Sequence, residues 1–439
     1  MLKKIDIENI LYKFILIMMI LLPLGKLLAY CLYLGGIIKD SFDFNQVYVL
    51  WYSIPILAII YLFGIFTKKF QLNKMDYITY GLIIFAFIST FVAKDRNISV
   101  YGELHRNEGL LTLLNYYLLF LNIKNIKTLK YQKNLINCFI YLGVFQVIYS
   151  VLQVYTSVPF VRHYSRQYMA MGLCANPNFL GSYMVMLTSI TSILYLLENK
   201  KRYLYLSFIF FFGICLGSST GPFLGYVLGF LFFILFYNKR FCIKKLIVLI
   251  ISFVIIFFAH DASIHYVEQK IREKEIDRYY NIKYDIIDTV NSQVQPNIEY
   301  SLGNGRIKLW ERLLPVAKEY FWLGAGIDNL RLVYPQNYLL IFDKAHNIYL
   351  QILITNGIFA LILYCLLCLI IFIKGFKIKE PCILACYIAF IAYSIQGFAN
   401  ISVIDVAPYF FIILGILSSS IDDIKLNIFK KNLQKVILR

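Results

Sequence analysis

Few residues of this chain could do acid–base chemistry, and His346 is the most informative of them. It follows a long polar segment, from about residue 261 to 345, and precedes the apolar run IYLQILITNGIFALILYCLLCLIIFIKG. An imidazole titrates near neutral pH and can move a proton there. We therefore treat His346 as a candidate general base and its neighbour Asn347 as a candidate substrate contact. The plainer alternative is an interfacial side chain without chemistry.

Guanidinium groups occur in the same kind of polar segment. Arg306 opens RIKLWERLLPVAKEYFWLGAG, Arg106 and Glu108 lie in GELHRNEG, and Arg166 lies in VRHYSRQYM. A guanidinium fork matches the oxygens of a phosphate, so these arginines are candidate diphosphate ligands, with Glu108 as a further substrate contact. The alternatives are a salt bridge between Arg106 and Glu108 and, for Arg306, a contact with lipid headgroups.

Asn176-Pro177-Asn178 stands directly before another apolar run. Proline suits the first turn of a helix, and asparagine is a favoured N-cap. Because a helix N-terminus also attracts anions, Asn176 and Asn178 are candidate ligands, with capping alone as the alternative. Lys26 lies inside the first apolar run, where an ionisable group is costly, so we expect it to contact substrate or a buried acid.

A membrane-embedded frame must position these residues. The 439 residues are 60% hydrophobic and 15% charged, more apolar surface than a soluble domain can bury. Apolar runs recur at the length of a bilayer-spanning helix. The sequence predicts an all-α integral membrane protein with about twelve transmembrane helices. They are expected near 13–38, 48–66, 76–93, 109–123, 134–155, 177–197, 203–217, 220–237, 245–260, 346–373, 382–400 and 406–420.

Basic residues predict the orientation. Alternate connections read TKKFQLNK, NIKNIKTLKYQK, ENKKR, NKRFCIKK and KGFKIKE, and the positive-inside rule places them and both termini in the cytoplasm. The division is then helices over 1–260, an outer loop over 261–345, helices over 346–420 and a basic tail over 421–439. The net charge of +18 is split among short loops, so we expect no nucleic-acid partner.

Within the outer loop, residues 306–321 predict an amphipathic helix lying along the membrane surface. Its apolar face is expected to comprise Trp310, Leu313, Leu314, Ala317 and Phe321. The nine cysteines lie mostly in apolar runs without histidine or acidic partners, and the outer loop has no Asp-x-Asp pattern, so we expect no metal. Several arginines, a histidine and carboxylates on one face suit an anionic, lipid-linked substrate.

The order of four segments resembles the O-antigen ligase and O-antigen polymerase (Wzy-type) superfamily. They are GELHRNEGLLTLLNYYLLF, GLCANPNFLGSYM, GRIKLWERLLPVAKEYFWLGAGIDNL and AHNIYLQILITNGIFALILY, within about residues 100–420. The matching positions are His346, Asn347, Leu350 and Gly357, then Gly305, Arg306 and Trp310, and Asn176, Pro177 and Asn178.

The resemblance implies a GT-C-like glycosyltransferase in the bacterial cytoplasmic membrane. It implies transfer of a glycan from an undecaprenyl-diphosphate carrier to a glycan or lipid-linked acceptor, at the outer face, without a metal or another cofactor. By motif match, His346 takes the role of activating the acceptor hydroxyl, and Arg306 that of binding the diphosphate. The lipid bilayer and other polysaccharide-assembly proteins are the further expected partners.

One position departs from the pattern of that superfamily. Many relatives carry Ser-Arg-Gly where this chain has Ser219-Thr220-Gly221, and Arg106 or Arg166 is a candidate to supply the charge. The resemblance does not separate a polymerase from a ligase. Two rival functions stay open: a flippase of the same lipid-linked glycan, and a sensor whose outer loop only binds glycan.

Overall fold

The computed structural model describes residues 6–34, 36–37, 46–104, 106–155, 169–174, 176–198, 200–272, 306–335 and 342–421. Arg166 and residues 422–439 of the predicted tail lie outside the described residues. All regular elements within these ranges are helices, and no strand occurs among them. This confirms the predicted all-α class.

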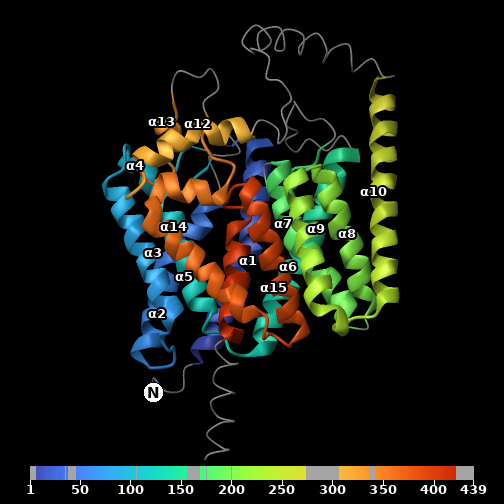
Figure 1. Cartoon of the computed structure of the whole chain (residues 1–439), viewed down its shortest axis with the longest axis horizontal. Coiled ribbons are helices and arrows are strands. Elements are labelled where there is room, and N and C mark those ends of the chain that lie inside the picture. The colour runs from blue at the N-terminus through green and yellow to red at the C-terminus, as the bar shows by residue number, and fades with distance from the viewer. Residues whose placement is uncertain are drawn as a thin grey trace, which may run out of the picture.

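Long helices stand side by side in one bundle (Figure 1). They are α1 (Ile7–Leu34), α2 (Val47–Phe66), α3 (Lys74–Phe91), α5 (Leu110–Ile123), α6 (Leu129–Tyr155), α7 (Pro177–Leu197), α8 (Lys201–Gly217), α9 (Thr220–Tyr237), α10 (Ile243–Arg272), α14 (Ile348–Gly375), α15 (Pro381–Gln396) and an unlabelled helix, Ala407–Ile421. The shorter elements are α4 (Arg96–Tyr101), α12 (Arg306–Glu319), α13 (Leu330–Val333), η2 (Asn238–Arg240) and η3 (Gly397–Ala399).

Eight helices are long and apolar enough to cross a membrane, namely α1, α2, α6, α7, α9, α10, α14 and α15. The other four predicted spans coincide with α3, α5, α8 and Ala407–Ile421, which are shorter or less apolar than these eight. The structure therefore supports a multi-pass membrane protein. Twelve crossings and a GT-C-like architecture stay predictions.

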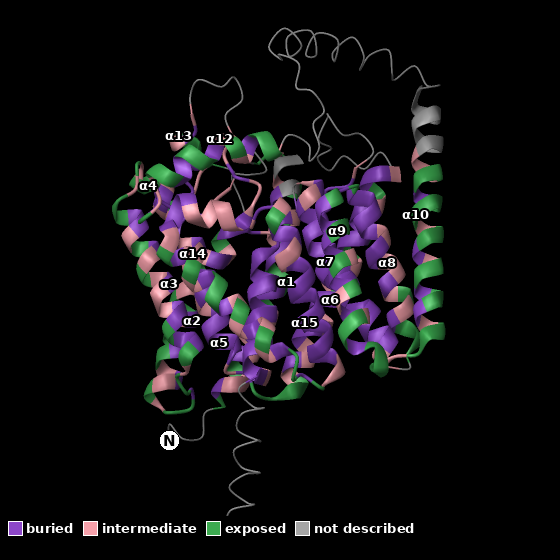
Figure 2. Ribbon diagram, in the orientation of Figure 1, coloured by how far each residue is buried: buried purple, intermediate pink, exposed green. Residues whose placement is uncertain are grey.

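Burial varies strongly from helix to helix (Figure 2). In α7, 94% of the spanning window is buried, whereas in α10 only 17% is. Ile251, Ile255 and Phe258 of α10 are each more than half exposed. In water such a continuous apolar surface would be unfavourable, so its natural environment is lipid.

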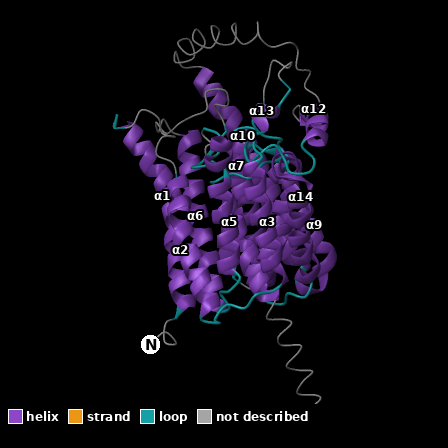
Figure 3. Cartoon of the chain, turned by 90° about the vertical axis from the view of Figure 1, so that its left-hand side faces the viewer, coloured by secondary structure: helices purple, strands orange, loops and turns teal. Residues whose placement is uncertain are grey.

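The two ends of the bundle differ in charge. The basic connections after α2, α5, α7, α9 and α14 lie at one end, where Arg240 donates to the carbonyls of Ile378 and Lys379. At the same end Lys133 Nζ lies 2.7 Å from Glu380 Oε1. The elements α12 and α13 cover the opposite end in two perpendicular views (Figures 1 and 3), and α4 lies near the same end in Figure 1.

Helix α14 changes direction inside its apolar run. Gly357 has φ +84°, and a Cβ built on it would lie 2.2 Å from the carbonyl oxygen of Trp322. Only glycine allows this backbone and this approach. The short first part of α14, residues 348–356, therefore packs against the segment that follows α12. The prediction of one continuous apolar helix from residue 346 was wrong on this point.

Two other boundaries differ from the prediction. Helix α10 continues to Arg272, beyond the expected end near residue 260, because its polar last turns still satisfy their backbone hydrogen bonds within the helix. Helix α14 begins at Ile348 rather than at His346, because the Asn347 side chain accepts from the backbone N–H groups of Tyr349 and Leu350, both at 3.0 Å.

Candidate functional site

A small second core holds α12 and α13 against the start of α14. It is built from Leu309, Leu313, Val316, Ala317, Leu330, Tyr334, Ala345 and Ile354. The predicted helix at 306–321 is thus confirmed as α12, but its buried face was partly wrong. Leu314 is 54% exposed and Leu309 is 2% exposed, because the contact stripe follows the spacing 309, 313, 316 and 317.

The backbone on both sides of His346 is fixed by side chains. Trp310 Nε1 of α12 donates to the Ala345 carbonyl at 2.9 Å, and Gln351 Oε1 accepts from Ala345 N–H at 2.8 Å. On the other side, Asn347 caps α14. His346 itself has φ +48°, a left-handed conformation that a non-glycine residue adopts only when its surroundings hold it there.

The imidazole of His346 lies among charged side chains. Burial, and next the positive charge of Arg306, lowers the pKa of His346 to about 4, while Asp343 opposes this shift. Within the part of the chain that the structure describes, its buried Nδ1 has no hydrogen-bond partner. At neutral pH the imidazole is therefore neutral and able to accept a proton.

Arg306 reaches across to the start of α9. A Cβ built on Gly221 would lie 3.9 Å from its Nη1, so the guanidinium stands over the turn formed by Ser219, Thr220 and Gly221. This is the turn in which an arginine was expected from the family resemblance. The Arg306 side chain thus connects that turn to the surroundings of His346.

Arg106 pairs with Asp343, with Nε and Oδ2 2.5 Å apart. The proposed salt bridge between Arg106 and Glu108 is therefore wrong. Burial alone would lower the pKa of Arg106, but the Asp343 carboxylate raises it. Its guanidinium carbon lies 5.8 Å from the centre of the Phe179 ring on α7, and its charge also acts on His346.

Glu108 belongs to a buried triad that sequence reasoning missed. Lys344 Nζ lies 2.9 Å from Glu108 Oε2 and 2.5 Å from Asp328 Oδ1, and all three side chains are at least 93% buried. Burial raises the pKa of Glu108 to about 7 against the opposing effect of Lys344. Burial would lower the pKa of Lys344, but Asp328 and Glu108 raise it. The only sequence signal was the Asp-Lys pair just before His346.

The asparagines of the Asn-Pro-Asn element have structural partners. Asn176 Oδ1 accepts from Asn178 N–H at 2.9 Å, which confirms it as the N-cap of α7. Asn178 Oδ1 accepts from Ser219 Oγ at 2.6 Å, and its carbonyl accepts from Asn400 Nδ2 at 3.2 Å. Asn178 thereby joins α7 to the turn before α9, close to Arg306.

Lys26 is 2% exposed and lies in α1. Burial raises the pKa of the Asp405 carboxyl, and the charge of Lys26 opposes that rise. Gln46 Nε2 also donates to Asp405. Of the two roles expected for Lys26, the structure provides the buried acid, Asp405.

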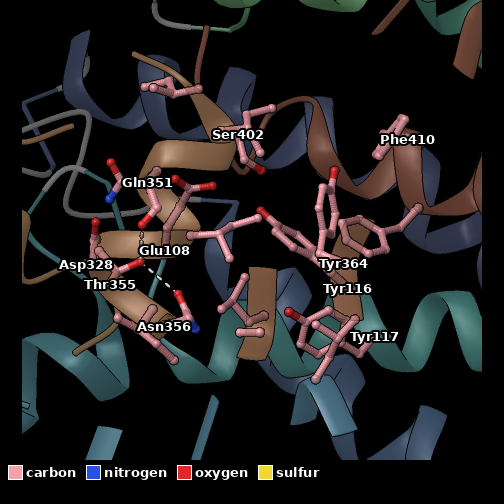
Figure 4. Close-up of a pocket in the computed structure, with 18 of the residues that line it drawn as sticks. Glu108, Tyr116, Tyr117, Asp328, Gln351, Thr355, Asn356, Tyr364, Ser402 and Phe410 are labelled. Carbon is pink, nitrogen blue, oxygen red and sulfur yellow. Dashed lines mark hydrogen bonds between the residues drawn. The ribbon is translucent and has the colours of Figure 1, made fainter. Parts of the chain in front are cut away.

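A half-open cavity lies beside the triad, between α3, α5, α14, α15 and Ala407–Ile421. In Figure 4 the polar residues Glu108, Asp328, Gln351 and Asn356 gather on one side and the aromatic residues on the other. His346 and Arg306 are not among its lining residues. Among the described residues, no group of three or more His, Cys, Asp or Glu side chains is placed to hold a metal ion.

Residues 205–365 match the family model described as O-Antigen ligase. The match begins in α8 and ends in α14, and it includes Arg306, Lys344, His346 and Gly357. The comparison with curated proteins finds no match.

Proposed function

We propose that this chain, whose residues 205–365 match the O-antigen ligase family model, transfers or polymerises glycan from an undecaprenyl-diphosphate-linked donor during cell-surface polysaccharide synthesis. The acceptor is a glycan or a lipid-linked glycan. The observation that carries the proposal is a buried, neutral histidine, His346, that lies within reach of the charges of Arg306 and Arg106. His346 and Arg306 both belong to the segment that matches the family.

His346 serves as the general base. Its imidazole takes the proton of an acceptor hydroxyl, whose oxygen forms the new bond to the anomeric carbon. The bond from that carbon to the diphosphate breaks, and its electron pair leaves with the diphosphate. Arg306 and Arg106 offset the negative charge of this leaving group. In this scheme Arg106 takes the place of the arginine that the turn at Thr220 lacks.

Donor binding would also strengthen the base. The charge of Arg306 is the second cause of the low pKa of His346, after burial. A diphosphate bound to Arg306 would offset that charge, so the pKa of His346 would rise toward its ordinary value. Proton transfer to His346 is then favoured when donor is present.

The distribution of basic residues supports an active site outside the cytoplasm. Basic connections gather at the end opposite α12, and such connections are retained in the cytoplasm. His346 would then face the outer side of the bacterial cytoplasmic membrane, away from nucleotide sugars. A donor already activated on a lipid carrier suits that side.

Surface polysaccharide from a deletion strain tests the proposal. Loss of long chains with single repeat units still attached indicates a polymerase, and loss of all attachment indicates a ligase. In both cases lipid-linked units accumulate on the outer face of the membrane. Accumulation on the inner face indicates a flippase, and unchanged polysaccharide would show that the chain does not act in its synthesis.

A further inference from the structure

The cavity beside Lys344 has a polar side and an aromatic side. We propose that it binds one uncharged sugar ring of the acceptor glycan. The inference rests on the proposed function. It adds a binding site for the acceptor, built from residues of α5, α14, α15 and Ala407–Ile421 and from Glu108 and Asp328, which precede α5 and α13.

Hydrogen-bonding groups line the side of the cavity nearest the triad. They include the carboxyl groups of Glu108 and Asp328 and the amides of Gln351 and Asn356. Gln351 Oε1 is held by Ala345 N–H, and Asn356 Oδ1 accepts from Thr355 Oγ1 at 2.7 Å. Both amide groups therefore have fixed orientations, and fixed amides and carboxyl groups suit the hydroxyls of a sugar.

Aromatic rings form the opposite side. Tyr116, Tyr364, Tyr393 and Phe410 line it, and Figure 4 shows the rings of Tyr116, Tyr364 and Phe410 close together. Tyr116 is 0% exposed, and among the described residues its hydroxyl has no hydrogen-bond partner. Leaving a buried hydroxyl unpaired is unfavourable, so an occupant that can hydrogen-bond to it is favoured.

The cavity has a volume of about 90 Å³ and is half-open, so it can hold a few ordered waters or part of one sugar ring that enters from the open side. The C–H faces of that ring would contact the aromatic rings while its hydroxyls reach the polar side.

The charges in the wall argue against an anionic or a purely hydrocarbon occupant. Lys344 is shared between two carboxyl groups, so the triad offers no net positive charge to a diphosphate. A hydrocarbon chain would leave the buried Tyr116 hydroxyl without a partner and would offer nothing to the amides of Gln351 and Asn356, which is unfavourable. A neutral polyol satisfies both sides of the cavity.

Saturation-transfer NMR on the full-length protein in nanodiscs tests this site. The probes are free glucose, galactose, N-acetylglucosamine and N-acetylgalactosamine at millimolar concentration. We expect a signal from at least one sugar, its loss in Ala360→Phe, which fills the cavity, and a severalfold weaker signal in Tyr116→Phe. Tyr237→Phe is the matched control, because it removes a buried hydroxyl at the basic end of α9, and it should bind as the wild type does.

Two results would overturn the inference: no signal from any of the four sugars, or a signal that Ala360→Phe leaves unchanged. If farnesol displaces the sugar signal and still binds to Tyr116→Phe, the cavity would be assigned to a lipid chain instead. His346→Ala separates the two proposals, since it should abolish transfer and keep the sugar signal. Transfer that depends on His346 without any sugar signal would refute this site alone.

Discussion

At the scale of single residues, the site depends on how neighbouring charges are paired. His346, Arg306 and Asn176 could be recognised from the sequence because each lies at or just before the start of a helix, beside a polar segment. The partners of Arg106 and Glu108 could not, because residues separated by more than 200 positions supply them. Asp343 and Lys344 are adjacent in sequence, and Arg106 and Glu108 pair with one each.

The effect of the Arg306 charge on the pKa of His346 can be measured directly. In Arg306→Gln the positive charge that lowers the pKa of His346 is removed, so the pKa should rise from its value near 4, while the larger effect of burial remains. Histidine NMR titration suits this purpose because the chain has five histidines. Lys308→Gln, on the exposed side of α12, is the control. An unchanged His346 titration in Arg306→Gln would rule out this electrostatic coupling.

We expect the rate of glycan transfer to fall as the pH decreases through about 7, because Glu108 becomes protonated there. This fall is the acidic limb of the pH–rate profile. The Glu108 carboxylate pairs with Lys344, which also contacts Asp328 and lies near Arg106. Protonation of Glu108 below its pKa of about 7 weakens the pair between Glu108 and Lys344. His346 remains neutral down to about pH 4 and does not produce this limb. Glu108→Gln should therefore be slow at pH 8 and show no limb near pH 7. A limb that persists in this variant would assign it to another group.

The same shift has a consequence for stability. The pKa of Glu108 is raised by folding, so its contribution to the free energy of unfolding is fully present below its unfolded value, near 4.5, and is lost as the pH rises through about 7. Glu108→Gln should remove this dependence. Thermal unfolding at pH 5 and pH 8, compared between wild type and variant, measures it.

At the scale of elements, α12 and α14 act as one unit around His346. The sequence predicted both helices from their apolar periodicity, and it predicted the N-cap of α7 from the Asn-Pro pair. It did not reveal the bend of α14, because Gly357 reads like any glycine within an apolar run. The reason for that glycine is the approach of the Trp322 carbonyl, a contact with another element.

Trp310 is the main link between these two helices and the histidine. In Trp310→Phe the hydrogen bond to Ala345 is lost, which should lower stability by only about 1 kcal/mol. The turnover number should fall about 10²-fold, because a displacement of the base by about 1 Å has an effect of that order. Trp322→Phe, at a residue that is 64% exposed, should leave turnover unchanged. Equal turnover in the two variants would refute the positioning role.

At the scale of the whole molecule, charge separates the two ends of the bundle. The sequence predicted this from the basic connections, and the structure brings all five of them to one end. It could not predict how deeply each helix is buried, because α9 and α15 have the same mean hydropathy of 1.8 while 44% of one and 78% of the other is buried. Burial depends on the order in which helices pack, and apolar periodicity does not encode that order.

Thiol labelling tests the orientation of the bundle. Cys242 is exposed in the basic connection before α10, and Asn97 is exposed on α4 at the opposite end. In an otherwise cysteine-free background, a membrane-impermeant maleimide should label Asn97→Cys in intact cells and Cys242 only after permeabilisation. Labelling in the reverse order would place His346 on the cytoplasmic side.

The most direct test of the central claim is glycan transfer by the purified protein in proteoliposomes with an undecaprenyl-diphosphate-linked donor and its acceptor. Product formation and release of undecaprenyl diphosphate would be measured for the wild type and for His346→Ala. We expect the variant to be slower by about 10²–10⁴-fold, the usual contribution of a general base, while it still binds donor. Transfer by His346→Ala at the wild-type rate would contradict the catalytic role of His346.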